Sequence, residues 1–286
     1  MNRTDIIDVI FELADNPQGF DEIEQEISES SEEIINNNLV DCGVLPEVFS
    51  HNSSEEKLWA KYSDILISES FSHLGLDSEV LGARGNSADV LAKTDNYSLV
   101  ADAKTFRLSR TSKNQKDFKV EALDNWRRDK NYSVLVAPLF QYPSTHSQVF
   151  SQAIKRNVTL FSYIHLRFLL ERDEIPNLEK IWNIGNLLKE ENEEESYNLA
   201  QPYWDKMDEI ITEIVGADLI EIAKYKKQAA KRFQELGEEG IGYWESKIEE
   251  FKSLPKEEAI KLLIEAKKID KKIIRIRKTM DVNLNN

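Results

Sequence analysis

The stretch SADVLAKTDNYSLVADAK, residues 87–104, decides the fold. It holds two short β-prone runs that are separated by Thr94-Asp95-Asn96, a turn signal. A hairpin with this turn places Asp89, in the first run, beside Asp102, at the end of the second. Because side chains alternate along a strand, Asp102 and Lys104 share a face. The sequence therefore predicts two carboxylates and a lysine at one end of a hairpin.

The residues around this hairpin predict a core of mixed α and β structure. Tyr132–Ala137 is a continuous apolar run, typical of a strand buried on both faces. We expect strands near residues 80–81, 88–92, 97–101, 132–137 and 158–163, and helices near 53–73, 114–130, 145–156 and 164–171. This order predicts an α/β (mixed α+β) fold with a mixed central sheet flanked by helices.

Helical patterns extend on both sides of this core. Apolar residues recur at helical spacing from Ile6 to Leu13, and an acidic amphipathic stretch covers residues 21–36. Beyond the acidic run Glu190–Glu195, residues 203–233 and 241–278 are helical in pattern. We divide the chain into an N-terminal helical segment (1–50), a core (51–185) and a C-terminal helical region (186–286).

Composition narrows the cellular setting. The single cysteine, Cys42, cannot form an internal disulfide, and the four histidines lack zinc-ligand spacing. No apolar run is long enough to span a membrane, and the first residues lack the features of a secretory signal. We expect an intracellular, reducing compartment and no membrane association.

The charge is unevenly distributed. A net charge of −15 argues against a uniformly basic nucleic-acid-binding module. Binding depends on the local field, however, and residues 103–119 carry six lysines or arginines against one acid, Asp117. A basic patch on an acidic body suits a protein that holds DNA on one face.

The predicted cluster fits the chemistry of phosphodiester hydrolysis. Mg²⁺ prefers oxygen ligands and is held by one or two carboxylates plus further oxygens, with Mn²⁺ a possible substitute. Asp89, Asp102 and the carbonyl of Ala103 offer such a set, and Lys104 can orient the attacking water. A surface hairpin with an ion pair is the alternative. The apolar residues Val100 and Ala101 favour the metal site, because they place Asp102 on a buried strand.

A third carboxylate is predicted from the helix before the hairpin. Ser53 and Glu56 form a capping-box pattern at its start. Glu69 falls within about 20° of Leu58, inside the apolar stripe of that helix. A glutamate facing inward is stable when it is paired or bound to metal. Exposure of Glu69 at the frayed helix end is the equal alternative.

Beyond these patterns, the longer stretch Leu99–Pro143 closely resembles the HindIII-like type II restriction endonucleases. Shorter stretches add to the likeness: GARGNSADV at 82–90, EKLWAKYSDI at 56–65 and GVLPE at 43–47. The likeness spans roughly residues 43–170, and the C-terminal third matches only in its helical, charged character. The spacing of Asp89, Asp102 and Lys104 is also similar to the PD-(D/E)xK nuclease signature, with Ala88 where proline is common.

The resemblance implies a PD-(D/E)xK restriction-endonuclease-like core and a function. It implies a bacterial, cytoplasmic homodimer that cleaves both strands of double-stranded DNA at a short palindrome and leaves 5′-phosphates. AAGCTT is the expected site, and a cognate DNA methyltransferase is the expected companion. The family roles fall on Asp89 and Asp102 as metal ligands and on Lys104 as the water-activating base or its stabiliser. Glu69 is assigned to the auxiliary glutamate.

The resemblance also gives the basic patch a role. We expect Asn114 and Gln115 to offer hydrogen bonds to adenine edges. The residues expected to contact phosphates are Arg107, Arg110, Lys113, Lys116 and Lys119. The terminal helices are expected to form the dimer interface and clasp the duplex.

Two other functions remain open from sequence. One is a sequence-specific DNA-binding protein whose nuclease core is inactive, which the presence of all three signature residues disfavours. The other is a helical scaffold, suggested by the acidic helical ends. The scaffold reading leaves the acidic pair, the lysine and the basic patch unexplained.

Overall fold

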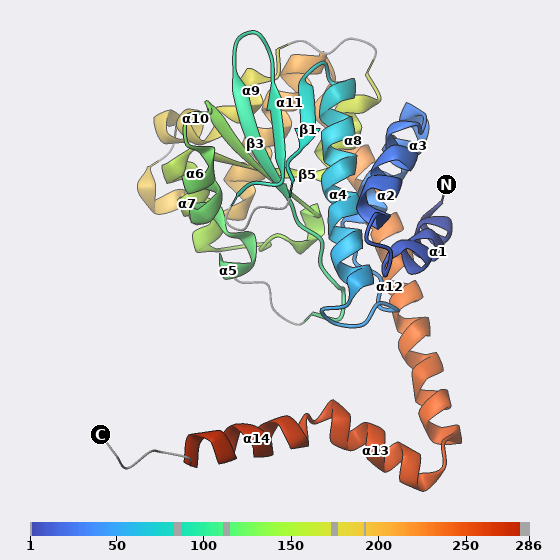
Figure 1. Cartoon of the computed structure of the whole chain (residues 1–286). Coiled ribbons are helices and arrows are strands. Elements are labelled where there is room, and N and C mark those ends of the chain that lie inside the picture. The colour runs from blue at the N-terminus through green and yellow to red at the C-terminus, as the bar shows by residue number, and fades with distance from the viewer. Residues whose placement is uncertain (1, 83–86, 111–114, 173–176, 192, 281–286) are drawn as a thin grey trace. The chain divides into compact units, whose positions relative to one another are not determined.

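A five-stranded mixed sheet forms the centre of the chain. The computed structural model describes residues 2–82, 87–110, 115–172, 177–191 and 193–280. The strands are β1 (Asp77–Val80), β2 (Val90–Lys93), β3 (Ser98–Ala103), β4 (Tyr132–Ala137) and β5 (Val158–Ser162), and they lie in this order across the sheet (Figure 1). Strands β1 to β3 are antiparallel, whereas β3, β4 and β5 are parallel. The predicted mixed sheet is confirmed.

Two strands begin two or more residues away from their predicted starts. β1 begins at Asp77, before the predicted residues 80–81. The prediction missed this start because β1 is a partly exposed edge strand, and its polar residues hide the strand pattern. β2 begins at Val90, so Asp89 lies directly before the strand and not inside it. The ladder still continues through Asp89, whose N–H donates to the carbonyl of Ala101 at 3.2 Å.

Helix α4 (Ser54–His73) covers one face of the sheet. Ser53 caps it as predicted, with Oγ accepting from the N–H of Glu56 at 3.2 Å. The Glu56 carboxylate accepts from the N–H of Asn52, one residue before the position that a capping box requires. α4 contacts β1, β2 and β3, while the helices α1 (Arg3–Leu13), α2 (Gly19–Ser28), α3 (Glu32–Cys42) and α8 (Tyr163–Leu170) also pack against it.

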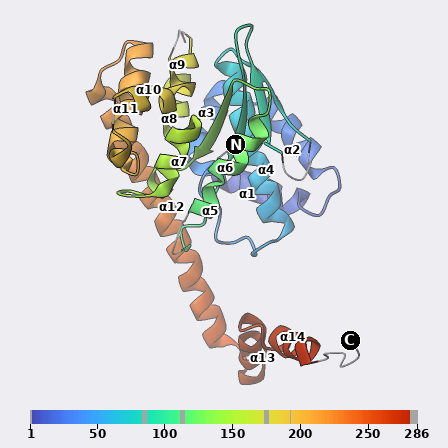
Figure 2. The ribbon, with the colours of Figure 1, turned by 90° about the vertical axis from the view of Figure 1, so that its left-hand side faces the viewer.

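The predicted helix over 114–130 is two helices. α5 (Gln115–Phe118) and α6 (Val120–Arg127) are separated by Lys119, whose φ of 49° is left-handed. Phe118 and Val120 lie about 200° apart on a continuous helix, so only one of them could face the core. The break at Lys119 lets both be buried. α6 and α7 (Gln148–Arg156) lie on the other side of the sheet from α4 (Figure 2).

The C-terminal part is helical, as predicted. It contains α9 (Glu179–Trp182), α10 (Ile184–Glu191), α11 (Ala200–Val215), α12 (Leu219–Ser253), α13 (Lys256–Ala266) and α14 (Ile269–Met280). Short 3₁₀ turns occur at Leu139–Gln141 and Glu194–Ser196. No helix in the described part of the chain is both long and apolar enough to cross a membrane.

The chain divides into two compact units. The first is Met1–Gly240, in which side chains of the N-terminal helices, the sheet and α9–α11 share one hydrophobic core. The second is Ile241–Asn286, where α13 and α14 contact each other. The functional division at residues 50 and 185 stays a prediction.

Candidate active site

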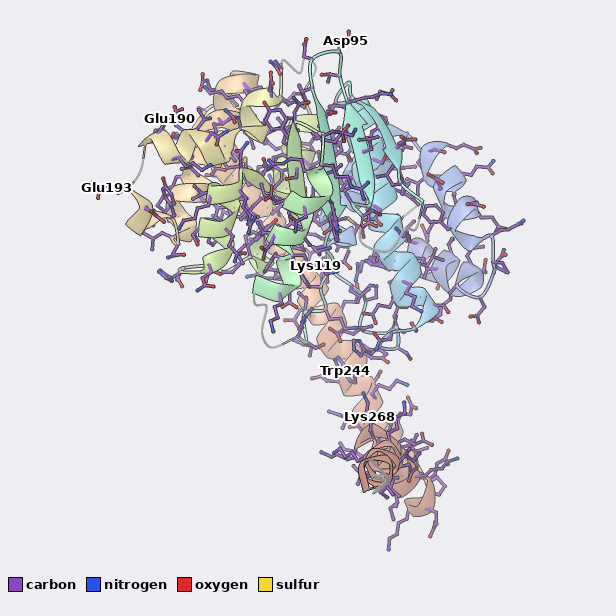
Figure 3. All side chains as sticks on the ribbon, turned by 60° about the vertical axis from the view of Figure 1, so that its left-hand side comes forward. Asp95, Lys119, Glu190, Glu193, Trp244 and Lys268 are labelled. Atoms are coloured by element: carbon purple, nitrogen blue, oxygen red, sulfur yellow. The ribbon has the colours of Figure 1, made fainter. Side chains whose placement is uncertain are left out.

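The β2–β3 hairpin brings Asp89 and Asp102 together, as predicted. Val90 pairs with Ala101, and the Asp89 N–H extends this ladder by one residue, so Asp89 stands opposite Asp102. The Asp89 carbonyl accepts from the N–H of Leu81 at 2.7 Å, which fixes the other side of its backbone. Asp102 is 2% exposed. The hairpin turn labelled at Asp95 lies at the opposite end of these strands (Figure 3).

The pKa values of the two carboxylates are shifted in opposite directions. Burial raises the pKa of Asp102 to about 6, and the hydrogen bond with Asp89 adds to the increase, whereas Lys104 opposes it. Burial also acts to raise the pKa of Asp89, but the hydrogen bond from Asp102 and the charge of Lys61 outweigh it and lower that pKa. Without a metal, Asp89 is thus the ionised member of the pair and Asp102 holds its proton more readily.

Lys104 lies beside Asp102 and is firmly supported. Its ammonium forms an ion pair with Oδ2 of Asp102. Its backbone N–H donates to the carbonyl of Val136 at 2.8 Å, and its carbonyl accepts from the hydroxyl of Tyr163 at 3.2 Å. These bonds hold the end of β3 to β4 and to α8, so the lysine position is set by the parallel part of the sheet.

A close approach at Gly43 supports the same end of the sheet. The Gly43 carbonyl accepts from the N–H of Phe106 at 3.1 Å. A Cβ on Gly43 would lie 2.7 Å from Cγ of Pro138 and 2.9 Å from the ring of Tyr163. Only glycine fits this gap without displacing the ring whose hydroxyl holds Lys104.

Helix α4 adds two charged residues that the sequence analysis missed. Asp64 is 4% exposed, and Nζ of Lys61 lies 3.2 Å from its Oδ2 and 3.1 Å from Oδ1 of Asp89. Burial raises the pKa of Asp64 well above its usual range, and the charge of Asp89 raises it further. An available signal was that Asp64 directly precedes the apolar run Ile65-Leu66-Ile67 within the predicted helix.

Glu69 lies elsewhere. It is half-buried, and its charge helps to raise the pKa of Glu24 in α2, after burial and Asp21. It follows Asp64 by five positions, a rotation of about 140° around the helix, so the two carboxylates leave α4 in different directions. The α4 carboxylate that Lys61 joins to Asp89 is that of Asp64, and the role of Glu69 as the auxiliary acid stays a prediction.

The cluster suits a hard divalent cation in its chemistry. No group of three or more His, Cys, Asp or Glu side chains is arranged as a ready metal site in the described ranges. Asp89, Asp102 and the Ala103 carbonyl nevertheless match a cation that needs few protein ligands. Oδ2 of Asp102 is buried and accepts no well-formed hydrogen bond from the described residues. The cation that this oxygen contacts is the Lys104 ammonium. An oxygen without a well-formed hydrogen bond is suited to bind a metal ion.

The predicted basic patch is only partly available to DNA. The Arg107 guanidinium donates to the carbonyl of Pro46 at 2.9 Å and to Glu56 at 3.1 Å, so it fastens a loop. Arg110 forms an ion pair with Asp117. Lys116 and Lys119 are exposed. Lys113, Asn114 and the side chain of Gln115 lie outside the described residues.

A cavity of about 450 Å³ adjoins the site and brings cations that the sequence analysis did not single out. Leu91 and Val100, which pair across β2 and β3, line this cavity together with Ala88, the residue directly before Asp89. Arg127, Arg128 and Lys130 also line it. Arg127 is paired with Asp124, whereas Arg128 is exposed and has a positive φ of 49°.

A second polar chain is structural. Ser162 Oγ lies 2.8 Å from Nδ1 of His165, and Nε2 of His165 lies 3.0 Å from Asp208, which pairs with Lys226. These residue types recur in nucleophilic triads. His165 is 0% exposed, however, and burial lowers its pKa to about 4. A neutral, inaccessible histidine of this kind joins α8 to α11 and α12 and cannot meet a substrate.

Comparison with known proteins agrees with this geometry. The family model described as "HindIII restriction endonuclease" matches residues 9–280. The chain is also similar to the type II restriction enzyme HindIII of Haemophilus influenzae. The two are 40% identical over 238 residues, which cover 81% of this chain and 78% of the relative.

Proposed function

The chain belongs to the HindIII restriction endonuclease family, and we propose that it is a magnesium-dependent type II enzyme that cuts double-stranded DNA at a short palindrome. The observation that carries this proposal is the grouping of Asp89, Asp102 and Lys104 at one end of the β2–β3 hairpin. In this proposal, water attacks the phosphorus of a DNA phosphodiester at this cluster and the bond between phosphorus and the 3′ oxygen breaks. The products carry a 5′-phosphate and a 3′-hydroxyl.

Each residue of the cluster has a part in this proposal. Asp89, Asp102 and the Ala103 carbonyl hold the cation, with Asp64 behind them as the auxiliary acid. When bound, magnesium neutralises charge on the phosphate and makes a bound water more acidic. Lys104 orients the attacking water and stabilises its deprotonated form. The buried setting of Asp102 strengthens these interactions, because water screens them poorly there.

The exposed cations near the site are proposed to hold the DNA backbone. Lys116 and Lys119 lie on and after α5, and Arg128 lines the cavity beside Ala88. Contacts of this kind fix the duplex in place but carry no base information. Arg110, Lys113, Asn114 and Gln115 remain proposed DNA contacts, and AAGCTT remains the proposed site. Arg107 has a structural role in this proposal.

We also propose a homodimer. In the unit Ile241–Asn286, the last turns of α12 expose Ile241, Trp244, Ile248 and Phe251, each between 47% and 52% (Figure 3 labels Trp244). Their spacing of three, four and three residues is that of a coiled-coil seam. Large exposed apolar stripes mark interaction sites. A two-fold pair of this chain matches a two-fold DNA site.

The same proposal implies a cellular location and a companion enzyme. A cytoplasmic bacterial enzyme that cuts DNA needs a DNA methyltransferase of the same specificity to protect the host. A catalytically inactive DNA-binding protein is the alternative. Incubating plasmid with the purified chain, with Mg²⁺ or with a chelator, separates the two: discrete fragments that appear only with Mg²⁺ support the enzyme, and binding without cleavage supports the alternative.

A further inference from the structure

Lys61 places a second ammonium in the acidic cluster. Its Nζ lies 3.1 Å from Oδ1 of Asp89 and 3.2 Å from Oδ2 of Asp64, and so bridges α4 and the residue that precedes β2. The side chains are partly or fully withdrawn from water, at 27% exposed for Lys61, 33% for Asp89 and 5% for Asp64. The bridge is a specific, half-buried interaction and not a solvated surface pair.

The charges explain why a cation is needed at this position. Asp64, Asp89 and Asp102 bring three carboxylates together, and the ion pair of Lys104 is with Asp102. Asp64 and Asp89 are the two carboxylates that Lys61 contacts. Lys61 lies between these two groups, where a positive charge relieves their repulsion most effectively.

We propose that Lys61 is a built-in counter-ion, which holds the Asp64–Asp89 pair together in the metal-free protein and competes with the divalent cation for it. This inference rests on the proposed function, in which Asp89 is a metal ligand. A bound Mg²⁺ lies about 2.1 Å from each ligand oxygen. A Mg²⁺ held by the Asp89 carboxylate would repel the Lys61 ammonium, which lies 3.1 Å from one oxygen of that carboxylate, so metal binding would require Lys61 to move away.

The Lys61 side chain can move away from the two carboxylates. It is partly exposed, and lysine is a compact charge on a flexible four-carbon chain. When the duplex enters the site, its phosphates offer Lys61 a new partner. The departure of Lys61 from Asp89 is then favoured by DNA, which couples metal binding to DNA binding. Lys61 is a positioning residue in this account, because it sets when the metal ligands become available.

Magnesium affinity in the absence of DNA tests this competition. Isothermal titration with MgCl₂ alone compares the wild type, Lys61→Gln and Lys57→Gln. Lys57 lies one turn earlier on α4, is exposed, and gives the same change in net charge. Lys61→Gln is expected to bind Mg²⁺ about tenfold more tightly than the wild type, a difference of about 1.4 kcal/mol. Lys57→Gln is expected to match the wild type within about twofold.

A conservative variant guards against a folding defect. Lys61→Arg keeps the charge and is expected to keep the weak affinity of the wild type, while metal-free Lys61→Gln melts at a lower temperature than Lys57→Gln. Equal Mg²⁺ affinity for Lys61→Gln and Lys57→Gln, weaker binding by Lys61→Gln, or no Mg²⁺ binding by any variant overturns the proposal.

The same proteins separate this inference from the proposed function. Tighter Mg²⁺ binding by Lys61→Gln, with no DNA cleavage by the wild type, supports the counter-ion and contradicts the nuclease. Cleavage by the wild type, with equal affinities for the two glutamine variants, supports the nuclease and overturns the counter-ion.

Discussion

The N–H of Asp89 donates to the carbonyl of Ala101 at 3.2 Å, which carries the β2–β3 pairing one residue beyond β2. Because of this bond, a residue that lies formally outside the strand is held as firmly as one inside it. Its carboxylate is fixed opposite Asp102. Catalytic groups need such support, since small displacements of reacting groups reduce rates strongly.

Lys104→Ala and Asp102→Asn are expected to abolish cleavage while leaving DNA binding largely intact. Each change removes one group from the reaction and none from the exposed cationic surface. We expect the cleavage rate to fall at least about 10³-fold, in line with the loss of a group that stabilises transition-state charge. Single-turnover cleavage and a filter-binding assay with Ca²⁺ give the two readouts. Normal cleavage by Lys104→Ala would remove this lysine from the mechanism.

Asp64→Asn and Glu69→Gln distinguish the two acids of α4. Asp64 is buried beside Asp89 and Lys61, whereas Glu69 lies near Glu24. We expect Asp64→Asn to reduce cleavage by roughly 10- to 100-fold, as supporting residues of metal sites do. Glu69→Gln is expected to stay within about threefold of the wild type. A large loss for Glu69→Gln and none for Asp64→Asn would reverse the assignment.

The raised pKa of Asp102 predicts a pH-dependent stability. The folded protein favours protonated Asp102, so this residue contributes stability below about pH 4 that is lost as the pH rises through about 6. Relative to Asp102→Asn, the metal-free wild type is expected to lose roughly 1–3 kcal/mol of unfolding free energy between pH 4 and pH 7. Urea unfolding with a chelator measures the difference. A difference that does not change with pH would contradict the buried acid.

Arg107 and Lys119 are expected to act in different ways. Arg107→Gln breaks bonds to Pro46 and Glu56, so it should cost about 1–3 kcal/mol of stability. Lys119→Gln alters an exposed side chain, so the stability of the fold should stay the same. DNA binding should weaken, and the plot of log affinity against log salt concentration should become less steep by about one unit. Urea unfolding and salt titrations of DNA affinity check the pair. The opposite pattern would restore Arg107 as a phosphate contact.

Much of the fold followed from local patterns. β4 matches its predicted bounds because Tyr132–Ala137 is apolar apart from Ser133, and α4 begins at its predicted cap, Ser53. The hairpin turn near Asp95 was enough to bring Asp89 and Asp102 together. The start of β1 was predicted too late in the chain, because an edge strand needs no apolar alternation to mark it. The break at Lys119 was missed because it depends on which side chains the core accepts.

The site was less predictable wherever it depended on tertiary contacts. A wheel gives the face of Glu69 but not the neighbour that the face meets, and here that neighbour is α2. Asp64 and Lys61 reach Asp89 across the packing of α4 on the sheet. Arg107 carries the same charge as its neighbours, and its bonds to the Pro46 carbonyl and the Glu56 carboxylate depend on the folded chain and cannot be read from the sequence.

Digestion of a plasmid of known sequence with Mg²⁺, followed by sequencing of the fragment ends, tests the central claim most directly. The account predicts discrete fragments whose ends carry 5′-phosphates and fall at one palindrome, with AAGCTT the expected sequence. Ends at another single palindrome would leave the enzyme in place and change its specificity. A random smear would contradict site-specific cleavage, and intact plasmid with every divalent metal tried would contradict the nuclease itself.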